Sequence, residues 1–521
     1  MDGIFEFKER NVIPIWRDFK RTVRMGELAD QVRLSIPGTA NIGRAIADWN
    51  IMQTIGTAAD LVNSAYVAGY FDRKEVEEAI RLIRQDKLSA GKSLIELVEA
   101  IENIQTGHEE KAGSVLLEFD TEDVQRIKRV FDGEVFFRIV HRTRELTRSE
   151  PRNPIVWVEM ARLYSTTNQN DKAELAMNIA LQLAPDSRFV LRAATRLFVH
   201  LGKAEKALFY LKQSAALEHD PWLLSAHIAT SSRIGRFSKL NRQGFTLVES
   251  KNYSPFDLTE LYSALGTLEF KHGERKKAKG LFNSSLIKPN DNSLAQLRWI
   301  SHEDHSFDFD PFAFQRVVNP FETYAFEYFN RSQWKDSYDN SIRWLLDTPY
   351  SVQPAALASY LATCILYRYE EGIAVCKLGL KVNHKDPVLL NNIVFAYSVT
   401  GRPEKAEYYL GQIMGLDWST LESEQVTMLT ATIGLTQMRN GAIALGKEFY
   451  FKALTLAKKL PNLYYKYMVI INFTRELLLA KDPDMHEFKK EMDDLKIESH
   501  FTDCIFMRRE VQKLAVPSSI K

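Results

Sequence analysis

Two short stretches of the sequence bring together residues that could do chemistry. The stretch SAGKSL at 89–94 has a Gly-Lys-Ser order that occurs in loops binding phosphate groups. Such a loop needs another glycine five residues before Gly91, and Asp86 stands there instead. The motif should also follow a strand, whereas the sequence before it is helical. We therefore interpret this stretch as a turn between two helices.

The second stretch, HEDH at 302–305, lies near Asp308 and Asp310 and gathers side chains of the kind that bind metals. It lacks the His-Glu-x-x-His spacing of helical zinc sites, and we interpret it as a solvated loop. The sequence has no Gly-x-Ser-x-Gly motif, and Cys376 falls at a position suited to helix packing. We expect no catalytic residue, no metal ion and no cofactor.

The segments that carry the remaining polar residues are helical. In DKAELAMNIALQLAPD (171–186), Ala173, Met177 and Ala180 lie on one helical face, and Pro185 follows where the helix must end. The preceding WVEMARLY (157–164) forms another amphipathic helix, and STTNQND is a turn-rich break between the two. The two stretches form one pair of antiparallel helices. Its small alanines predict a close helix crossing.

The same pattern recurs along the chain with a period of about 34 residues. Ala207 lies one period after Ala173, and Ser214 lies one period after Ala180. A fixed period of this size indicates stacked helix pairs, because one pair cannot bury both of its apolar faces alone. We count about eight or nine units over roughly 120–480. Two of them, 120–153 and 221–254, are degenerate and are recognised by position.

The order of residues within the clearest unit resembles the tetratricopeptide repeat. Its matching positions are Trp157, Met160, Ala161, Tyr164, Ala173, Met177, Ala180 and Pro185. A later unit matches again at Tyr262, Leu265, Gly266, Gly273, Ala278, Phe282 and Ser285. The resemblance implies an all-α fold, a right-handed α-solenoid of tetratricopeptide-type helical hairpins. Helical sequence at 75–104, outside the repeats, adds an N-terminal α-helical region.

The period divides the chain into five segments. Residues 1–118 lack it and form the N-terminal helical region, which is a cap or an effector domain. A first repeat block covers 119–300, and a loop at 301–318 separates it from a second block at 319–480. The charged segment 481–521 is a C-terminal capping helix and tail, because the end of a solenoid needs a polar outer face.

In tetratricopeptide arrays the first helix of each pair lines the inner groove, and this resemblance assigns candidate partner-binding residues. In the first block they are Arg162, Arg192, Arg196, His200 and Arg233. The arginines would form a basic stripe suited to the carboxylates of an acidic peptide or to the phosphates of a nucleic acid. The alternative is a solvated face whose charge is balanced by neighbours such as Glu159.

The groove of the second block is aromatic. Its candidate residues are Phe326, Phe329, Asn391 and Phe395, which would suit an apolar helix or an extended peptide. The alternative is that these side chains pack against adjacent repeats or the N-terminal domain. Chaperone-binding members of the family carry Lys and Asn at set groove positions. Asn391 and Asn392 fall near such places, but Phe395 and Leu361 occupy neighbouring groove positions, so we do not infer binding of chaperone tails.

Composition limits the compartment and the partners. The net charge is +1, which gives no overall attraction to nucleic acid or to an anionic membrane. Charges near the N-terminus replace the apolar core of a signal peptide, and the apolar run at 464–473 is about half of the ~20 residues that a membrane span needs. Three scattered cysteines favour a reducing compartment. We expect a cytoplasmic protein with no membrane partner.

These observations favour a non-catalytic interaction scaffold or adaptor. It would bind a protein or peptide in the groove of the solenoid. One alternative is a nucleic-acid-associated repeat protein that uses the basic stripe. Another is an effector activity within 1–118 that the repeats regulate.

Overall fold

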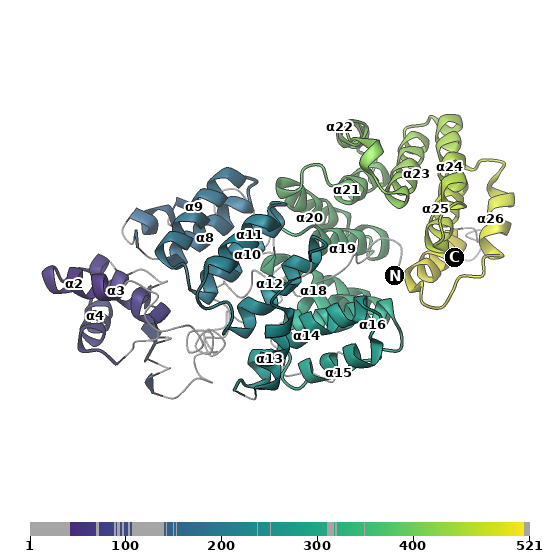
Figure 1. The fold of residues 1–521 in the computed structure, drawn as a ribbon. Coiled ribbons are helices and arrows are strands. Elements are labelled where there is room, and N and C mark those ends of the chain that lie inside the picture. The colour runs from purple at the N-terminus through teal and green to yellow at the C-terminus, as the bar shows by residue number, and fades with distance from the viewer. Residues whose placement is uncertain are drawn as a thin grey trace. The chain divides into compact units, whose positions relative to one another are not determined.

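A computed structural model of the chain describes residues 42–68, 72–87, 151–152, 154–236, 238–250, 252–309, 320–348 and 350–514, with Val317 and parts of 90–106 and 140–148. Within these residues every regular element is a helix (Figure 1). The chain divides into two compact units at Phe321, and the following paragraphs treat each unit by itself. The predicted all-α fold is confirmed.

The N-terminal part of the first unit contains three described helices. They are α2 (Ile42–Ile51), α3 (Ile55–Ala68) and α4 (Lys74–Gln85), and α3 contacts both of the others. Arg152, just before the repeats, forms an ion pair with Asp48 of α2. The region is therefore helical where it is described. Most of the 89–94 stretch and much of 1–118 lie outside the described residues. An effector domain within 1–118 therefore stays a prediction.

Helical hairpins then follow one another through the first unit. They are α8 (Pro154–Ser165) with α9 (Asn170–Leu183), α10 (Arg188–His200) with α11 (Ala204–Gln213), α12 (Pro221–Arg233) with α13 (Asn241–Glu249), and α14 (Pro255–Lys271) with α15 (Arg275–Ser285), before α16 (Asp291–Glu303). Each first helix contacts the first helix of the next hairpin, from α8 to α16. This stacking is the arrangement of an α-solenoid.

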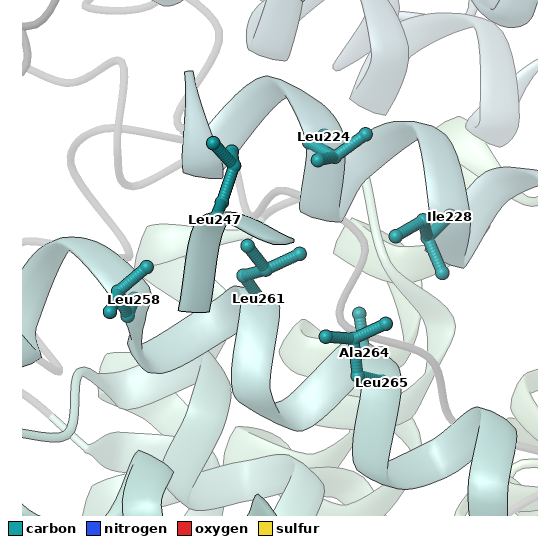
Figure 2. Packing of buried hydrophobic residues seen from close by; sticks show 7 residues of the cluster. All are labelled: Leu224, Ile228, Leu247, Leu258, Leu261, Ala264 and Leu265. Carbon is teal, nitrogen blue, oxygen red and sulfur yellow. The ribbon is translucent and has the colours of Figure 1, made fainter. Parts of the chain in front are cut away.

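The contact between two successive hairpins shows what stabilises the stack. Leu224 and Ile228 of α12, with Leu247 of α13, pack against Leu258 and Leu261 of α14 (Figure 2). Fully burying one such side chain is worth about 1.5–3 kcal/mol. A single hairpin would leave this apolar face in water, so each hairpin depends on the next.

The second unit repeats the pattern. Its hairpins are α17 (Phe321–Asn330) with α18 (Trp334–Asp347), α19 (Val352–Tyr360) with α20 (Tyr369–Val382), α21 (Pro387–Val399) with α22 (Pro403–Met414), α23 (Ser423–Arg439) with α24 (Ile443–Ala457), and α25 (Leu463–Ala480) with α26 (Met485–Asp493). A π-helical turn, η4 (Leu361–Ile365), extends α19. A short 3-10 turn, η5 (Trp418–Thr420), precedes α23.

The turns inside the hairpins repeat one backbone conformation along the chain. Each turn has one residue in the left-handed region, and this residue is Gly202 in the second hairpin and Gly401 in α21–α22. Two other turns use a non-glycine residue in this conformation, Asn168 and Tyr367. Each of them lies one repeat period before one of those glycines. A left-handed residue lets the chain reverse directly after a helix.

Small residues lie at the helix crossings, as predicted. Ala173 and Ala180 of α9 are fully buried, and α9 packs on α8. In α24, a Cβ atom added to Gly446 would lie 2.7 Å from the carbonyl oxygen of Gly434 in α23. No side chain larger than glycine fits between those two backbones without moving them.

The C-terminal segment differs from the expected single capping helix. It forms α26 and a further helix, α27 (Thr502–Leu514), which packs on α25 and on η4. Asp503, Cys504, Met507 and Val511 of α27 are buried. The helix therefore contacts the first helices of the hairpins instead of extending the stack.

The close crossing of α8 and α9 gives a test of the packing. We expect Ala173→Arg to lower the free energy of unfolding by about 3 kcal/mol or more, because it overpacks the crossing and buries an unpaired charge. Urea unfolding followed by circular dichroism measures the change. Leu175→Arg is the matched control, since Leu175 lies on the same helix and is 62% exposed. Equal stability of the two variants would contradict the packing described here.

Candidate functional site

The predicted basic stripe does not have the exposure that was expected of it. Arg192 is fully buried, and its Nη1 and Nη2 atoms donate to the Glu260 carboxylate at 2.8 and 3.2 Å. Its guanidinium carbon lies 4.9 Å from the centre of the Trp222 ring. The prediction that Arg192 points into an open groove is wrong, because an acid of α14 holds the side chain inside the unit.

Arg162 follows the alternative interpretation. Its Nε atom donates to Glu159 at 2.9 Å, three residues earlier on the same helix. Both side chains are more than four-fifths buried. The charge of Arg162 is therefore balanced locally.

Arg196, His200 and Arg233 lie near one another at the C-terminal ends of α10 and α12. Burial, and secondarily the charge of Arg196, lowers the pKa of His200 to about 4 and also lowers the pKa of Arg233. His200 is therefore neutral at pH 7. Arg196 and Arg233 remain as the charged part of the stripe, and Arg233 lies in the last turn of α12, where the helix dipole favours a cation.

In the second unit, two of the predicted aromatic residues belong to the core. Phe326 is fully buried and packs edge-on against Trp344, with ring centres 5.7 Å apart. Phe329 is 3% exposed and contacts the rings of Trp334 and Tyr360. The alternative interpretation, packing within the repeats, describes both residues.

The other two predicted residues line a cavity on the first-helix face of the second unit. This first-helix cavity has a volume of about 660 Å³, including the part open to solvent. Its walls include Tyr360, Asn391, Phe395, Thr432, Tyr464 and Met468. These side chains come from α19, α21, α23 and α25, so four successive hairpins build one site.

Hydrogen bonds between helices fix the polar wall of the cavity. The Thr432 hydroxyl donates to the Asn391 side-chain oxygen at 2.6 Å. The neighbouring Asn392 amide donates to Ser359 at 3.0 Å. The guanidinium carbon of Arg475 lies over the Phe395 ring, 5.2 Å from the centre of that ring. Neither the amides nor the ring can turn freely.

The C-terminal helix reaches this site, which the sequence did not reveal. The hydroxyls of Tyr360 and Tyr464 both donate to Oδ2 of Asp503, at 2.6 and 2.8 Å. Burial, together with the Asp503 charge, raises the pKa of both tyrosines, so both remain hydrogen-bond donors. Tyr360 and Asp503 are 143 residues apart, and no periodic signal links them.

A second cavity adjoins the first and shares Cys364 and Asn472 with it. Its volume is about 910 Å³, again including open space. Arg439 and Arg475 line it, together with residues of α27. We call it the arginine cavity. Neither arginine is among the groove positions predicted from the sequence, which in this unit were mostly aromatic.

Other chemical candidates gain no support from the structure. In the described part of the chain, no group of three or more His, Cys, Asp or Glu side chains could hold a metal ion. The 302–305 stretch begins in α16 instead of forming only a loop, and Asp310 lies outside the described residues. Cys364, Cys376 and Cys504 are free thiols. Among the described helices, none has the length and apolar character that a membrane crossing requires.

No protein-family model and no curated protein matches the chain. Similar solved structures include yeast Tom70, at 12% identity and a TM-score of 0.28, covering 76% of this chain and 96% of that one. The human IFIT1 dimer with PPP-AAAA has 12% identity and a TM-score of 0.29, covering 94% and 99%. The P58(IPK) TPR domain has 13% identity and a TM-score of 0.24, covering 74% and 98%.

The chain's own hairpins, its left-handed turns and its stacked first helices carry the assignment. They define an all-α protein with a tetratricopeptide-like helical-repeat fold.

The buried Arg192–Glu260 pair predicts a large effect on stability. We expect Arg192→Gln to cost about 3–5 kcal/mol, because it leaves the Glu260 charge buried without its partner. The double variant Arg192→Met, Glu260→Met should recover most of that loss. Arg236→Gln is the control, because Arg236 is exposed, and it should change stability by about 0.5 kcal/mol or less. Urea midpoints measure all three. A mild effect of Arg192→Gln would mean that the pair is not buried.

One buried histidine, His227, and one half-buried histidine, His200, predict a loss of stability in acid. Burial lowers the pKa of His200 and of His227 from 6.5 to about 4. Below about pH 6.5 the unfolded chain takes up protons that the folded chain refuses, so stability falls as the pH drops towards 4.

We expect His227→Gln to reduce the difference between urea midpoints measured at pH 7 and at pH 5. His219→Gln, at an exposed position of the same unit, should leave that difference unchanged. A pH dependence identical in all three proteins would show that His227 titrates normally.

Proposed function

We propose that the protein is a non-catalytic scaffold that binds a protein segment or peptide in the first-helix cavity of the second unit. The observation that carries the proposal is that four successive hairpins contribute side chains to one cavity. Because stacking fixes those helices, the cavity is a pre-formed surface. A pre-formed surface lowers the entropic cost of binding.

The lining suits a peptide. Phe395, Tyr464 and Met468 provide apolar and aromatic contact area, which dominates the affinity of most protein interfaces. Asn391 and Asn472 add side-chain amides, which can both donate hydrogen bonds to a peptide backbone and accept them from it. Aromatic walls with a few fixed polar groups are typical of grooves that bind extended or helical segments.

The reactive groups of the cavity argue for binding over catalysis. Cys364 is the thiol in its wall, and burial raises the pKa of this thiol to about 11. The thiol therefore stays protonated near neutral pH and is a poor nucleophile. Tyr360 and Tyr464 are protonated for the same physical reason.

Nucleic-acid binding gains less support. The basic stripe was the feature that favoured it, and Arg192 and Arg162 of that stripe are paired with acids. The overall charge of +1 supplies no wider attraction to phosphates. We therefore propose only the protein or peptide partner.

Selection from a random peptide library on the full-length protein tests the proposal. We expect peptides to be enriched, and we expect Met468→Glu to weaken their binding about tenfold or more, because it places a charge in the apolar wall. Met414→Glu is the matched control, since Met414 is 61% exposed on the second helix of a hairpin. Isothermal titration measures both. If no peptide is enriched, or if Met468→Glu binds as well as the control, the proposed site is wrong.

A further inference from the structure

The arginine cavity contains more positive charge than its own carboxylates neutralise. Arg439 and Arg475 both donate to one buried carboxylate, that of Glu476, which is 2% exposed. Glu510 also lines the cavity, but it forms an ion pair with Lys513 at 2.5 Å. Lys513 itself does not line the cavity, so the two arginines that do line it share the single charge of Glu476.

Arg475 also has an unmet donor. Its Nε atom donates to Oε1 of Glu476 at 2.8 Å. Its Nη2 atom is buried and has no hydrogen-bond acceptor among the described residues. Leaving a buried donor on a charged group without an acceptor is costly, so such a group calls for an explanation. Arg475 also lines the arginine cavity, which has space for an acceptor from a ligand.

We propose that the arginine cavity binds an acidic side chain, Asp or Glu, of the same peptide whose apolar residue occupies the first-helix cavity. The inference rests on the proposed function and specifies the partner. A carboxylate has two coplanar oxygens, which match the fork of a guanidinium group. Arg475 is the principal ligand, and Arg439, which is partly exposed at the cavity, adds a second positive charge.

The surroundings strengthen such a contact. Ile471, Met507 and Val511 line the cavity and reduce the access of water to the guanidinium groups. A charge-assisted hydrogen bond is stronger where water is excluded. At the cavity, Tyr367 follows the π-helical turn η4 and has a left-handed backbone, with φ of 55°. Burial raises the pKa of Tyr367 to about 12, so its hydroxyl stays protonated and can donate to an anion.

The two cavities are close enough for one peptide. Cys364 and Asn472 belong to the walls of both, so the sites are separated by single side chains. An extended chain advances at most about 3.3–3.6 Å per residue. An acidic residue only a few positions from the apolar anchor therefore reaches the arginine cavity. This gives the partner a short apolar–acidic motif.

The test uses the peptides selected on the wild-type protein. We expect Asp or Glu to be fixed at one position near the apolar residue. In a selected peptide that carries Glu, replacing this residue by Gln should weaken binding to the wild-type protein roughly 10- to 100-fold. This arm needs no protein variant, so it does not depend on how a variant folds.

Variants of the protein then locate the contact. Arg475→Gln should weaken binding of the acidic peptide by a similar factor. It should leave binding of the peptide's Gln version unchanged. Arg475→Lys, which keeps the charge and loses the fork, should give an intermediate loss. Arg402→Gln removes an arginine that pairs with Glu370 outside both cavities, and it is the control. Circular dichroism checks that each variant is folded.

Glu476→Gln supplies a readout that a purely structural role would not give. It removes the carboxylate that competes for both arginines, so we expect it to tighten binding of the acidic peptide while Arg475→Gln weakens it. Selected peptides without an acidic preference, or acidic peptides that bind Arg475→Gln and the wild type equally, would overturn the inference and leave the peptide site standing. A failure to enrich any peptide would instead overturn the proposed function and, with it, this inference.

Discussion

The close crossing of two helices within each hairpin is the constraint on which the rest of the structure depends. Where Ala173 meets α8, or Gly446 meets Gly434, the backbones approach so closely that the hairpin is a thin slab with an apolar face on each side. Such a slab cannot be stable alone, and the next hairpin must cover it. Stacking the slabs brings all first helices to one face, and the cavities of the second unit are a consequence of that alignment.

This constraint is local, which explains why the fold could be predicted from the sequence. Small residues that recur once in every repeat period indicate where the two helices of a hairpin cross. Gly401 indicates a turn. The turns at Asn168 and Tyr367 gave a weaker signal, because a non-glycine residue in the left-handed region is not visible as such in a sequence. The degenerate unit at 221–254 forms a hairpin, α12 with α13, although its residues match the repeat poorly.

The site was less predictable because its contacts are long-range. A helical projection assigned Arg192 to a face, but it could not reveal that Glu260, 68 residues later, would pair with that arginine. Phe326 and Phe329 lie on first helices as expected, yet neighbouring aromatic rings cover them. Asn391 and Phe395 do line a cavity. Asp503, which holds two tyrosines of its wall, comes from α27, a helix outside the repeat period.

Arginines illustrate how structure separates a structural role from a binding role. Arg192 uses both terminal nitrogens on Glu260, so its charge is satisfied inside the protein. An unmet donor is not sufficient evidence of a site, since Arg188 also has buried terminal nitrogens without acceptors, yet it lines neither cavity and lies over the Trp222 ring. Arg475 combines an unmet donor, a cavity and a carboxylate shared with a second arginine. Only that combination leaves both the space and the charge for an anionic group from another molecule.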